Sequence, residues 1–191
     1  LLNVAGTLPA SIIFDMEQAE TKDLILSIFM RLFEEEPYRT FPHAGIALQA
    51  YRTDTRDDVQ RLLAWTTQRQ VPMTIRLVKG AYWDSDAIRY RQRGWAMPLF
   101  EQKSLTDVNY ESLVRVLLEQ SHLIRPAFGT HNLRSLAVIE AVAEALGLPA
   151  AAWEYQMIYG MAEPFQYAMS DRGRRLRLYA PVGELLPGMA Y

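Results

Sequence analysis

The sequence predicts an α/β fold in which buried parallel strands alternate with helices, and three observations support this prediction. Six short apolar runs, rich in β-branched or aromatic residues, recur along the chain and are typical of buried strands. Segments of helical period lie between them. The runs are apolar almost throughout, as expected when protein covers both faces of a parallel sheet. Most of them start 22 to 34 residues apart, and one interval is 53 residues long.

These intervals favour a (β/α)₈ TIM-like barrel, in which one unit takes roughly 31 residues. The predicted strands, in order, are Ser11–Met16, Gly45–Tyr51, Met73–Tyr82, Pro126–His131, Glu154–Tyr159 and Leu176–Pro181. The predicted helices are Thr21–Glu34, Asp57–Arg69, Ser85–Arg93, Asp107–Gln120 and Leu133–Leu146. A doubly wound sheet is the alternative. It is disfavoured because the first turn reads Asp15-Met16-Glu17 and the chain has no G-x-G-x-x-G motif.

The barrel is expected to be incomplete in this chain. About six of eight strands are present, and the last is followed only by Val182–Tyr191, where a final helix should begin. No internal repeat beyond the strand–helix rhythm and no linker-like stretch marks a second domain. We therefore expect residues 1–191 to form one partial barrel domain, either as a piece of a longer protein or as an open sheet.

Composition excludes several classes of function. With 20 Lys+Arg against 22 Asp+Glu and no basic tract, the chain is not expected to bind nucleic acid. It has no cysteine and three histidines, so neither a disulfide nor a metal site is expected. The most apolar stretch, Leu136–Trp153, contains Glu140 and Glu144 and is predicted to be a packed helix instead of a membrane span. Leu1–Thr7 lacks the features of a secretory signal, which predicts a cytoplasmic location.

Polar side chains gather where the predicted strands end. They are Asp15, Glu17, Gln49, Lys79, Tyr82, Thr130, His131, Gln156 and Tyr179. In a parallel barrel these ends open onto one mouth, where such enzymes carry their active sites. The alternative is that these are ordinary polar loops.

The third predicted strand places an arginine on an otherwise apolar face. Period-two alternation puts Arg76 and Val78 on one face and Ile75 and Leu77 on the other. A buried arginine needs an anionic or polar partner. That partner is either a bound ligand or an internal carboxylate such as Asp15, and the spacing does not choose between them.

The turn after this strand has the features of a phosphate site. Gly80 would let the backbone approach a ligand closely, and Asp84 or Ser85 could cap the following helix, whose amino end attracts anions. Together with Arg76, Lys79 would then bind phosphate or pyrophosphate. The alternative is that Lys79 is simply solvated.

Three further motifs each allow two interpretations. The sequence Thr130-His131-Asn132 predicts a hydrogen-bonding cluster at a strand end, with Asn132 as the N-cap of the next helix. The segment Asp171–Arg175 is most simply a solvated loop. Four aromatic residues could form a wall for a flat cofactor or could belong to the core: Tyr82, Trp83, Tyr159 and Tyr179.

The eleven residues Ile75-Arg76-Leu77-Val78-Lys79-Gly80-Ala81-Tyr82-Trp83-Asp84-Ser85 closely resemble the signature of the proline dehydrogenase domain of proline utilisation A-type bifunctional flavoenzymes. Five other segments agree in order and spacing. They are Asp15–Glu17, Leu48–Tyr51, Thr130–Asn132, Glu154–Gln156 with Gly160–Pro164, and Leu178–Gly183. The resemblance extends over nearly the whole chain from Ser11 onward.

The resemblance implies a barrel that holds FAD and oxidises L-proline to Δ1-pyrroline-5-carboxylate by hydride transfer to flavin N5. It assigns the flavin and ribityl contacts to Gln49, Arg76, Val78, Gly80, Ala81 and Trp83. It assigns the phosphates and the rest of FAD to Lys79, Thr130, His131 and Gln156. It assigns the proline pocket to Asp15, Tyr82, Ile158 and Tyr179.

The resemblance also implies partners and departures. A membrane quinone would accept the electrons at the inner membrane, and an aldehyde dehydrogenase domain could follow in the parent chain. The family's arginine pair for the substrate carboxylate would lie beyond Tyr191, and a pocket lysine would precede this sequence, so we expect a fragment. Its open sheet edges would allow a homo-oligomer. Two other functions stay open: a non-catalytic scaffold or partner-binding module, and a barrel enzyme for a phosphate ligand.

Overall fold

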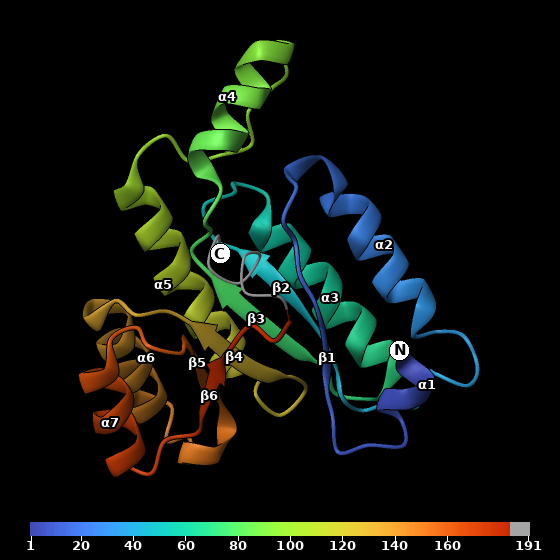
Figure 1. The fold of residues 1–191 in the computed structure, drawn as a ribbon, viewed down its shortest axis with the longest axis vertical. Helices are drawn as coiled ribbons and strands as arrows, with labels where there is room; N and C mark the ends of the chain where they lie inside the picture. Colours follow the sequence, from blue (N-terminus) through green and yellow to red (C-terminus); the bar gives the residue numbers. More distant parts are fainter. Residues whose placement is uncertain (184–191) are drawn as a thin grey trace.

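The computed structural model describes residues 1–183 and shows a curled half-barrel of six parallel strands (Figure 1). The strands are β1 (Ile12–Phe14), β2 (Ala44–Gln49), β3 (Thr74–Val78), β4 (Arg125–Gly129), β5 (Glu154–Ile158) and β6 (Leu176–Tyr179). Each strand pairs with its neighbours in the sequence, in the order β1 to β6. The predicted α/β class, the six strands and the partial barrel are therefore confirmed.

Helices connect these strands. The α-helices are α1 (Leu2–Ala5), α2 (Lys22–Leu32), α3 (Thr55–Arg69), α4 (Trp83–Arg93), α5 (Lys103–Glu119), α6 (Leu133–Ala145) and α7 (Glu163–Asp171). The short 3₁₀ helices are η1 (Ala19–Thr21) and η2 (Ala150–Ala152). The five predicted helices are present with ends shifted by a few residues. The expectation of a missing final helix concerns residues 184–191, which lie outside the described residues.

The two faces of the sheet differ in chemistry. Along β3, Ile75 and Leu77 are fully buried while Arg76 and Val78 are half-buried, as the alternation predicts. Ile75 and Leu77 belong to the main apolar core, which continues into α3, α5 and α6. The other face carries Arg76 and the polar ends of the strands. The helices therefore cover the apolar face, and the opposite face is left for a binding site.

A glycine in β2 lets the first three strands lie close to one another. Gly45 of β2 pairs with Ile13 of β1 and Thr74 of β3. A Cβ at Gly45 would lie 2.4 Å from the Ile13 side chain and 2.8 Å from the Thr74 Cβ. A larger residue here would force the neighbouring side chains apart, so the glycine is required by packing.

One arginine fixes the segment between α2 and β2. The Arg69 side chain, 8% exposed, lies near the end of α3 against the rings of Phe33 and Trp65. Its guanidinium donates to main-chain carbonyl oxygens of that segment at 2.7 Å (Phe41) and 3.0 Å (Arg39). These bonds satisfy carbonyl groups that no strand or helix pairs.

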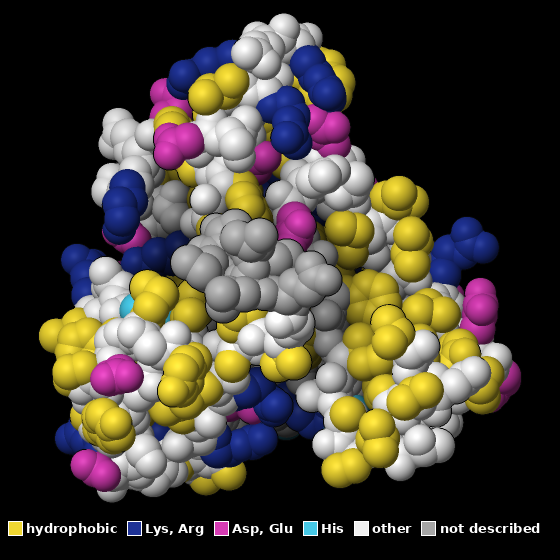
Figure 2. Space-filling view, in the orientation of Figure 1, with side chains coloured by type: hydrophobic (Ala, Val, Ile, Leu, Met, Phe, Trp, Pro, Cys, Tyr) yellow, Lys and Arg dark blue, Asp and Glu magenta, His cyan; other side chains and the backbone are white. Residues whose placement is uncertain are grey.

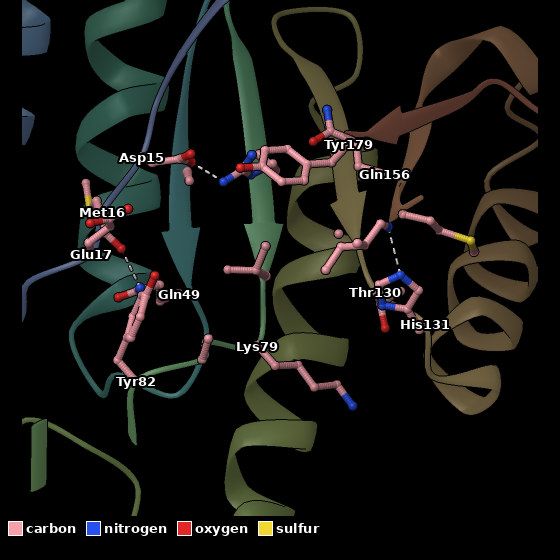
Figure 3. A pocket seen from close by; sticks show the side chains of 18 of the residues that line it. Asp15, Met16, Glu17, Gln49, Lys79, Tyr82, Thr130, His131, Gln156 and Tyr179 are labelled. Atoms are coloured by element: carbon pink, nitrogen blue, oxygen red, sulfur yellow. Dashed lines mark hydrogen bonds and ion pairs between the residues drawn. The ribbon is translucent and has the colours of Figure 1, made fainter. Parts of the chain in front are cut away.

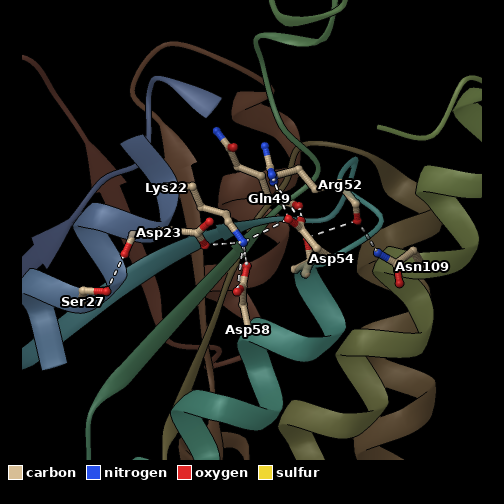
Figure 4. Close-up of polar contacts among 9 residues, drawn as sticks. Lys22, Asp23, Ser27, Gln49, Arg52, Asp54, Asp58 and Asn109 are labelled. Carbon is tan, nitrogen blue, oxygen red and sulfur yellow. Dashed lines mark hydrogen bonds and ion pairs between the residues drawn. The ribbon is translucent and has the colours of Figure 1, made fainter. Parts of the chain in front are cut away.

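Buried charges join α2 to the turn between β2 and α3 (Figure 4). Lys22 lies 2.8 Å from Asp58, 3.0 Å from Asp54 and 3.1 Å from Asp23. Arg52 binds Asp54 through two nitrogens, at 2.8 and 2.9 Å. Burial disfavours the charge on Lys22, but hydrogen bonds to Asp58 and Asp54 outweigh burial and raise the lysine pKa. This charged cluster fixes the position of the loop between β1 and α2 relative to the end of β2.

The surface is mixed in character. In Figure 2, Lys and Arg side chains over the projecting helix α4 are interspersed with Asp and Glu. Arg93 of α4 lies 2.7 Å from Glu20. On α2, Leu24 and Ile28 are exposed. Within residues 1–183, no helix is long and apolar enough to cross a membrane.

Candidate functional site

A cavity of about 410 Å³ lies at the carboxyl ends of the strands (Figure 3). Residues from the ends of all six strands line it. Thirteen of the predicted site residues are among them: Asp15, Gln49, Arg76, Val78, Lys79, Gly80, Ala81, Tyr82, Thr130, His131, Gln156, Ile158 and Tyr179. The fold thus brings together side chains that are up to 164 positions apart, from Asp15 to Tyr179.

Trp83 is the exception among the predicted site residues. It is the first residue of α4, and its indole Nε1 donates to the Phe100 carbonyl at 2.8 Å. Its ring packs against the small cluster formed by Tyr51, Ala87 and Leu99. The structure places it behind the wall of the cavity, although the sequence places it next to Tyr82. Tyr159 is also outside the cavity and is 70% exposed.

Arg76 projects from the middle of β3 into the cavity and forms an ion pair with Asp15 from the loop after β1. Asp15, the internal carboxylate expected as one possible partner of Arg76, therefore does pair with it. The pair uses Nη2 of the guanidinium. Within residues 1–183, Arg76 Nε is buried and has no hydrogen-bond partner. A donor of this kind in a cavity wall is available to an acceptor on a ligand.

Lys79 follows β3, and its side chain runs toward α5 (Figure 3). The ammonium lies 2.6 Å from Asp107, which also binds Lys103 at 2.8 Å. It also lies 5.6 Å from the centre of the Tyr110 ring. Two lysines thus share one carboxylate, whose pKa is lowered because their hydrogen bonds and charges outweigh its burial. The interpretation of Lys79 as merely solvated was wrong.

The turn after Lys79 differs from the prediction in two ways. No side chain caps α4, whose N-cap is Tyr82, and the Ser85 hydroxyl donates instead to the Tyr82 carbonyl at 3.0 Å. The predicted cap by Asp84 or Ser85 was wrong because the helix starts earlier. Gly80 has φ +117° and is packed against Tyr51, so its lack of a side chain serves an internal contact.

The cluster after β4 behaves as both interpretations require. Asn132 Oδ1 accepts from the Ser135 amide at 3.1 Å and caps α6, as predicted. Thr130 Oγ1 accepts from the Asn132 amide at 3.1 Å. His131 Nε2 accepts from the Ile158 amide at 2.9 Å, and burial lowers the pKa of the imidazole. The ring is therefore neutral and joins the ends of β4 and β5.

Two amides fix neighbouring parts of the cavity. Gln49, 7% exposed, donates through Nε2 to the Met16 carbonyl at 2.7 Å, which ties the end of β2 to the loop after β1. Gln156 donates through Nε2 to Glu154 at 2.7 Å. Glu154 also binds Arg177 at 2.8 Å. Burial raises the pKa of Glu154, but the hydrogen bonds from Arg177 and Gln156 outweigh it and lower the pKa.

Some lining residues were not identified as site residues from the sequence. They are Met16, Ala47, Gly129, Asn132 and Met157; Glu17, which also lines the cavity, was expected at the strand ends but was given no role. The sequence does carry a signal for Ala47 and Gly129. Each lies two positions before a polar residue, Gln49 and His131, and alternation along a strand places residues two apart on the same face. Their small size leaves room beside Arg76 and Val78, with which they pair in register.

The segment Asp171–Arg175 is not wholly a solvated loop, so that prediction was wrong in part: Asp171 ends α7, and Arg175 donates to the Ala151 carbonyl at 3.1 Å. Arg174 forms an ion pair with Glu140 and lies 5.5 Å from the centre of the Trp153 ring. Long-range partners of this kind cannot be read from a run of charges.

No group of three or more His, Cys, Asp or Glu side chains in residues 1–183 could hold a metal ion.

Comparison with known proteins identifies the family. The family model described as proline dehydrogenase matches residues 1–191. The chain belongs to the proline dehydrogenase family. This confirms the resemblance seen in the sequence. The bifunctional protein PutA of Klebsiella aerogenes is 33% identical over 184 residues, which cover 93% of this chain and 14% of the relative. Proline dehydrogenase 1 of Bacillus subtilis (strain 168) is 28% identical, over 96% of this chain and 53% of the relative.

Solved structures agree. The crystal structure of proline utilization A (PutA) from Bdellovibrio bacteriovorus, inactivated by N-propargylglycine, matches with a TM-score of 0.96 and 44% identity. The match covers all of this chain and 20% of that chain. The chain thus corresponds to part of each of these proteins.

Proposed function

We propose that this proline dehydrogenase family chain forms part of an FAD-dependent enzyme that oxidises L-proline to Δ1-pyrroline-5-carboxylate. The substrate would lose a hydride from the ring carbon next to nitrogen and a proton from the nitrogen, which leaves a C=N bond. Bound FAD would supply the acceptor for the hydride. Family membership and the cavity at the strand ends support this proposal.

The unpaired Arg76 Nε carries the argument that the cavity fits a flavin cofactor. A flavin presents several acceptor atoms on a flat ring, and a buried unsatisfied donor is unfavourable unless a ligand pairs it. Arg76 is half-buried on a rigid strand, and Asp15 orients it. Its positive charge would stabilise the negative charge that a flavin ring gains when reduced.

The remaining residues divide by chemistry as the resemblance implies. Lys79 supplies a cation for the phosphates, with Thr130, His131 and Gln156 as polar contacts to the rest of the cofactor. Gln49, Val78, Gly80 and Ala81 line the flavin side. Tyr82, Tyr179 and Ile158 would surround the proline ring and exclude water from the reacting carbon. Trp83 would act from behind the wall, through its packing against Tyr51.

Further proposals concern the parent protein. The relatives named bifunctional are much longer than this chain, which supports a second catalytic domain. We propose an aldehyde dehydrogenase domain there, a membrane quinone as electron acceptor, and a cytoplasmic location peripheral to the inner membrane.

The test uses the full-length protein that contains this chain. After reconstitution with FAD it should show flavin absorbance bands, and proline added without oxygen should bleach them. Arg76→Met should lower FAD affinity at least tenfold, since a charge-assisted hydrogen bond contributes about 1.5–3 kcal/mol. The control is Arg115→Met, at a 58% exposed site on α5.

Flavin bands that never appear, or that Arg76→Met leaves unchanged, would contradict the proposal. Thermal shift separates the alternatives. Stabilisation by phosphate esters but by neither FAD nor proline analogues would indicate a phosphate-ligand enzyme. No stabilisation by any of them would favour a scaffold.

A further inference from the structure

A set of contacts behind the cavity wall connects the end of β2 to the start of α4. Tyr51, the second residue after β2, is 2% exposed, and its amide donates to the Lys79 carbonyl at 2.8 Å. Its phenol donates to Asp86 Oδ2 at 2.7 Å. Lys79 lines the cavity, whereas Tyr51 and Asp86 do not. The contacts therefore hold the wall from its outer side.

The ring of Tyr51 also occupies the space that a side chain at Gly80 would need. A Cβ at Gly80 would lie 1.6 Å from Tyr51 Cδ1 and 1.9 Å from Cε1. Gly80 has φ +117°, a conformation that other residues rarely adopt. The path of the turn after β3 is thus set by the tyrosine ring that lies against it.

Asp86 depends on the same tyrosine. It lies in the first turn of α4, is 1% exposed, and its amide donates to the Tyr82 carbonyl at 2.9 Å. Within residues 1–183, Asp86 Oδ1 is buried and has no hydrogen-bond partner. The carboxylate is therefore satisfied only at Oδ2, by the Tyr51 phenol, among the described residues. Burial, together with the hydrogen bond to Asp86, raises the pKa of Tyr51, so the phenol keeps the proton it donates.

We propose that Tyr51 and Asp86 are positioning residues that hold the Lys79–Tyr82 turn in place as one wall of the binding cavity. Tyr51 sets the turn through its ring and its amide, and the Asp86 carboxylate ties the first turn of α4 to the Tyr51 phenol. If the phenol is lost, the buried carboxylate has no donor and the start of α4 must shift toward water. Tyr82 and Lys79 would shift with it. That ligands occupy this cavity rests on the function proposed above.

The test compares Tyr51→Phe, Asp86→Ala, Asp86→Asn and the double variant Tyr51→Phe/Asp86→Ala in the full-length protein. Tyr167→Phe, at a 68% exposed site on α7, is the matched control. Hydrogen–deuterium exchange of a peptide covering residues 79–87 reports the turn without any cofactor. The KM for proline and the Kd for FAD report its effect on the site.

Exchange of residues 79–87 should accelerate about tenfold in Tyr51→Phe and in Asp86→Ala, because each leaves one buried polar group unpaired. The KM for proline and the Kd for FAD should rise several-fold. The double variant should be no worse than either single one, since no unpaired partner then remains. Asp86→Asn should be milder than Asp86→Ala, because its amide oxygen can still accept from Tyr51.

Two results would overturn the proposal. One is unchanged exchange of residues 79–87 in Tyr51→Phe relative to Tyr167→Phe. The other is faster exchange with unchanged KM and Kd, which would give these residues a purely structural role. If the wild-type protein bound no FAD, the proposed function would fail, and exchange alone would still decide whether Tyr51 and Asp86 hold the turn.

Discussion

Replacing Lys22 with methionine tests the buried charged cluster that supports the loop after β1. Lys22 is 6% exposed and Asp58 is 7% exposed, and they lie 2.8 Å apart. Removing one partner of a buried ion pair destabilises by about 3–5 kcal/mol. Asp54 keeps its bond to Arg52 after the change, which places the effect near about 3 kcal/mol, the lower end of that range. This corresponds to roughly a hundredfold increase in the local opening constant.

The assay is native-state hydrogen exchange of peptides covering α2 and the first turn of α3 in the full-length protein. It reports local opening whatever other domains are present. Lys103→Met is the matched control, because that lysine is 76% exposed and its partner Asp107 retains Lys79. We expect an effect below about 1 kcal/mol there.

A second variant separates lost charge pairing from lost packing. In Lys22→Met/Asp58→Leu both charges are replaced by apolar groups, and much of the protection should return. If Lys22→Met accelerates exchange no more than Lys103→Met does, the reasoning is refuted, because the cluster then contributes no more than a surface pair.

Three further predictions concern the glycine in the turn after β3, the buried arginine of α3 and the pH dependence of stability. Gly80→Ala should disrupt the turn after β3 by more than about 2 kcal/mol, measured by exchange, whereas Gly94→Ala, also at positive φ but with open space around it, should lose only about 1 kcal/mol. Equal effects would count against the steric argument. Arg69→Met should cost about 2–4 kcal/mol in the segment before β2, since several bonds to carbonyl groups are lost together. Arg115→Met, on the surface, should change stability by less than about 0.5 kcal/mol. Burial lowers the pKa of His131 in the folded chain, so the unfolded chain takes up a proton on this histidine first as the pH falls. The free energy of unfolding therefore holds its full value, as far as His131 contributes, above about pH 6.5 and declines below it. In His131→Gln, the melting temperature measured against pH should no longer show the part of this decline that begins at about pH 6.5. A profile identical to that of the unmodified protein would exclude the histidine as the cause of the decline.

The strands and their polar ends were readable from the sequence for a physical reason. A buried parallel strand must be apolar on both faces, so each run of such residues stands out and ends where polar residues begin. Once the strands are parallel, geometry places their carboxyl ends together, and residues as distant as Asp15 and Tyr179 reach one cavity. The alternation along β3 likewise placed Arg76 on the cavity side.

What the sequence missed depends on long-range contacts or on where a helix begins. Trp83 was grouped with three tyrosines as a possible wall for a flat cofactor, but α4 begins at this residue and its indole donates to the Phe100 carbonyl. Arg174 was assigned to solvent because Glu140 and Trp153, which bind it, are distant in sequence. Helix α7 was not predicted because its nine residues give only a short stretch of helical period, although Pro164 in its first turn is typical of a helix start.

The order of the strands has a consequence for how the chain assembles. Within residues 1–183, every ladder joins two strands that follow one another in the sequence, so none of these six strands needs a partner from a distant part of the described chain. Short separations between pairing segments reduce the entropy lost on closing each loop and speed folding. A nascent chain could therefore add one strand at a time to a growing template as it leaves the ribosome, with the first two units already paired before the last is synthesised.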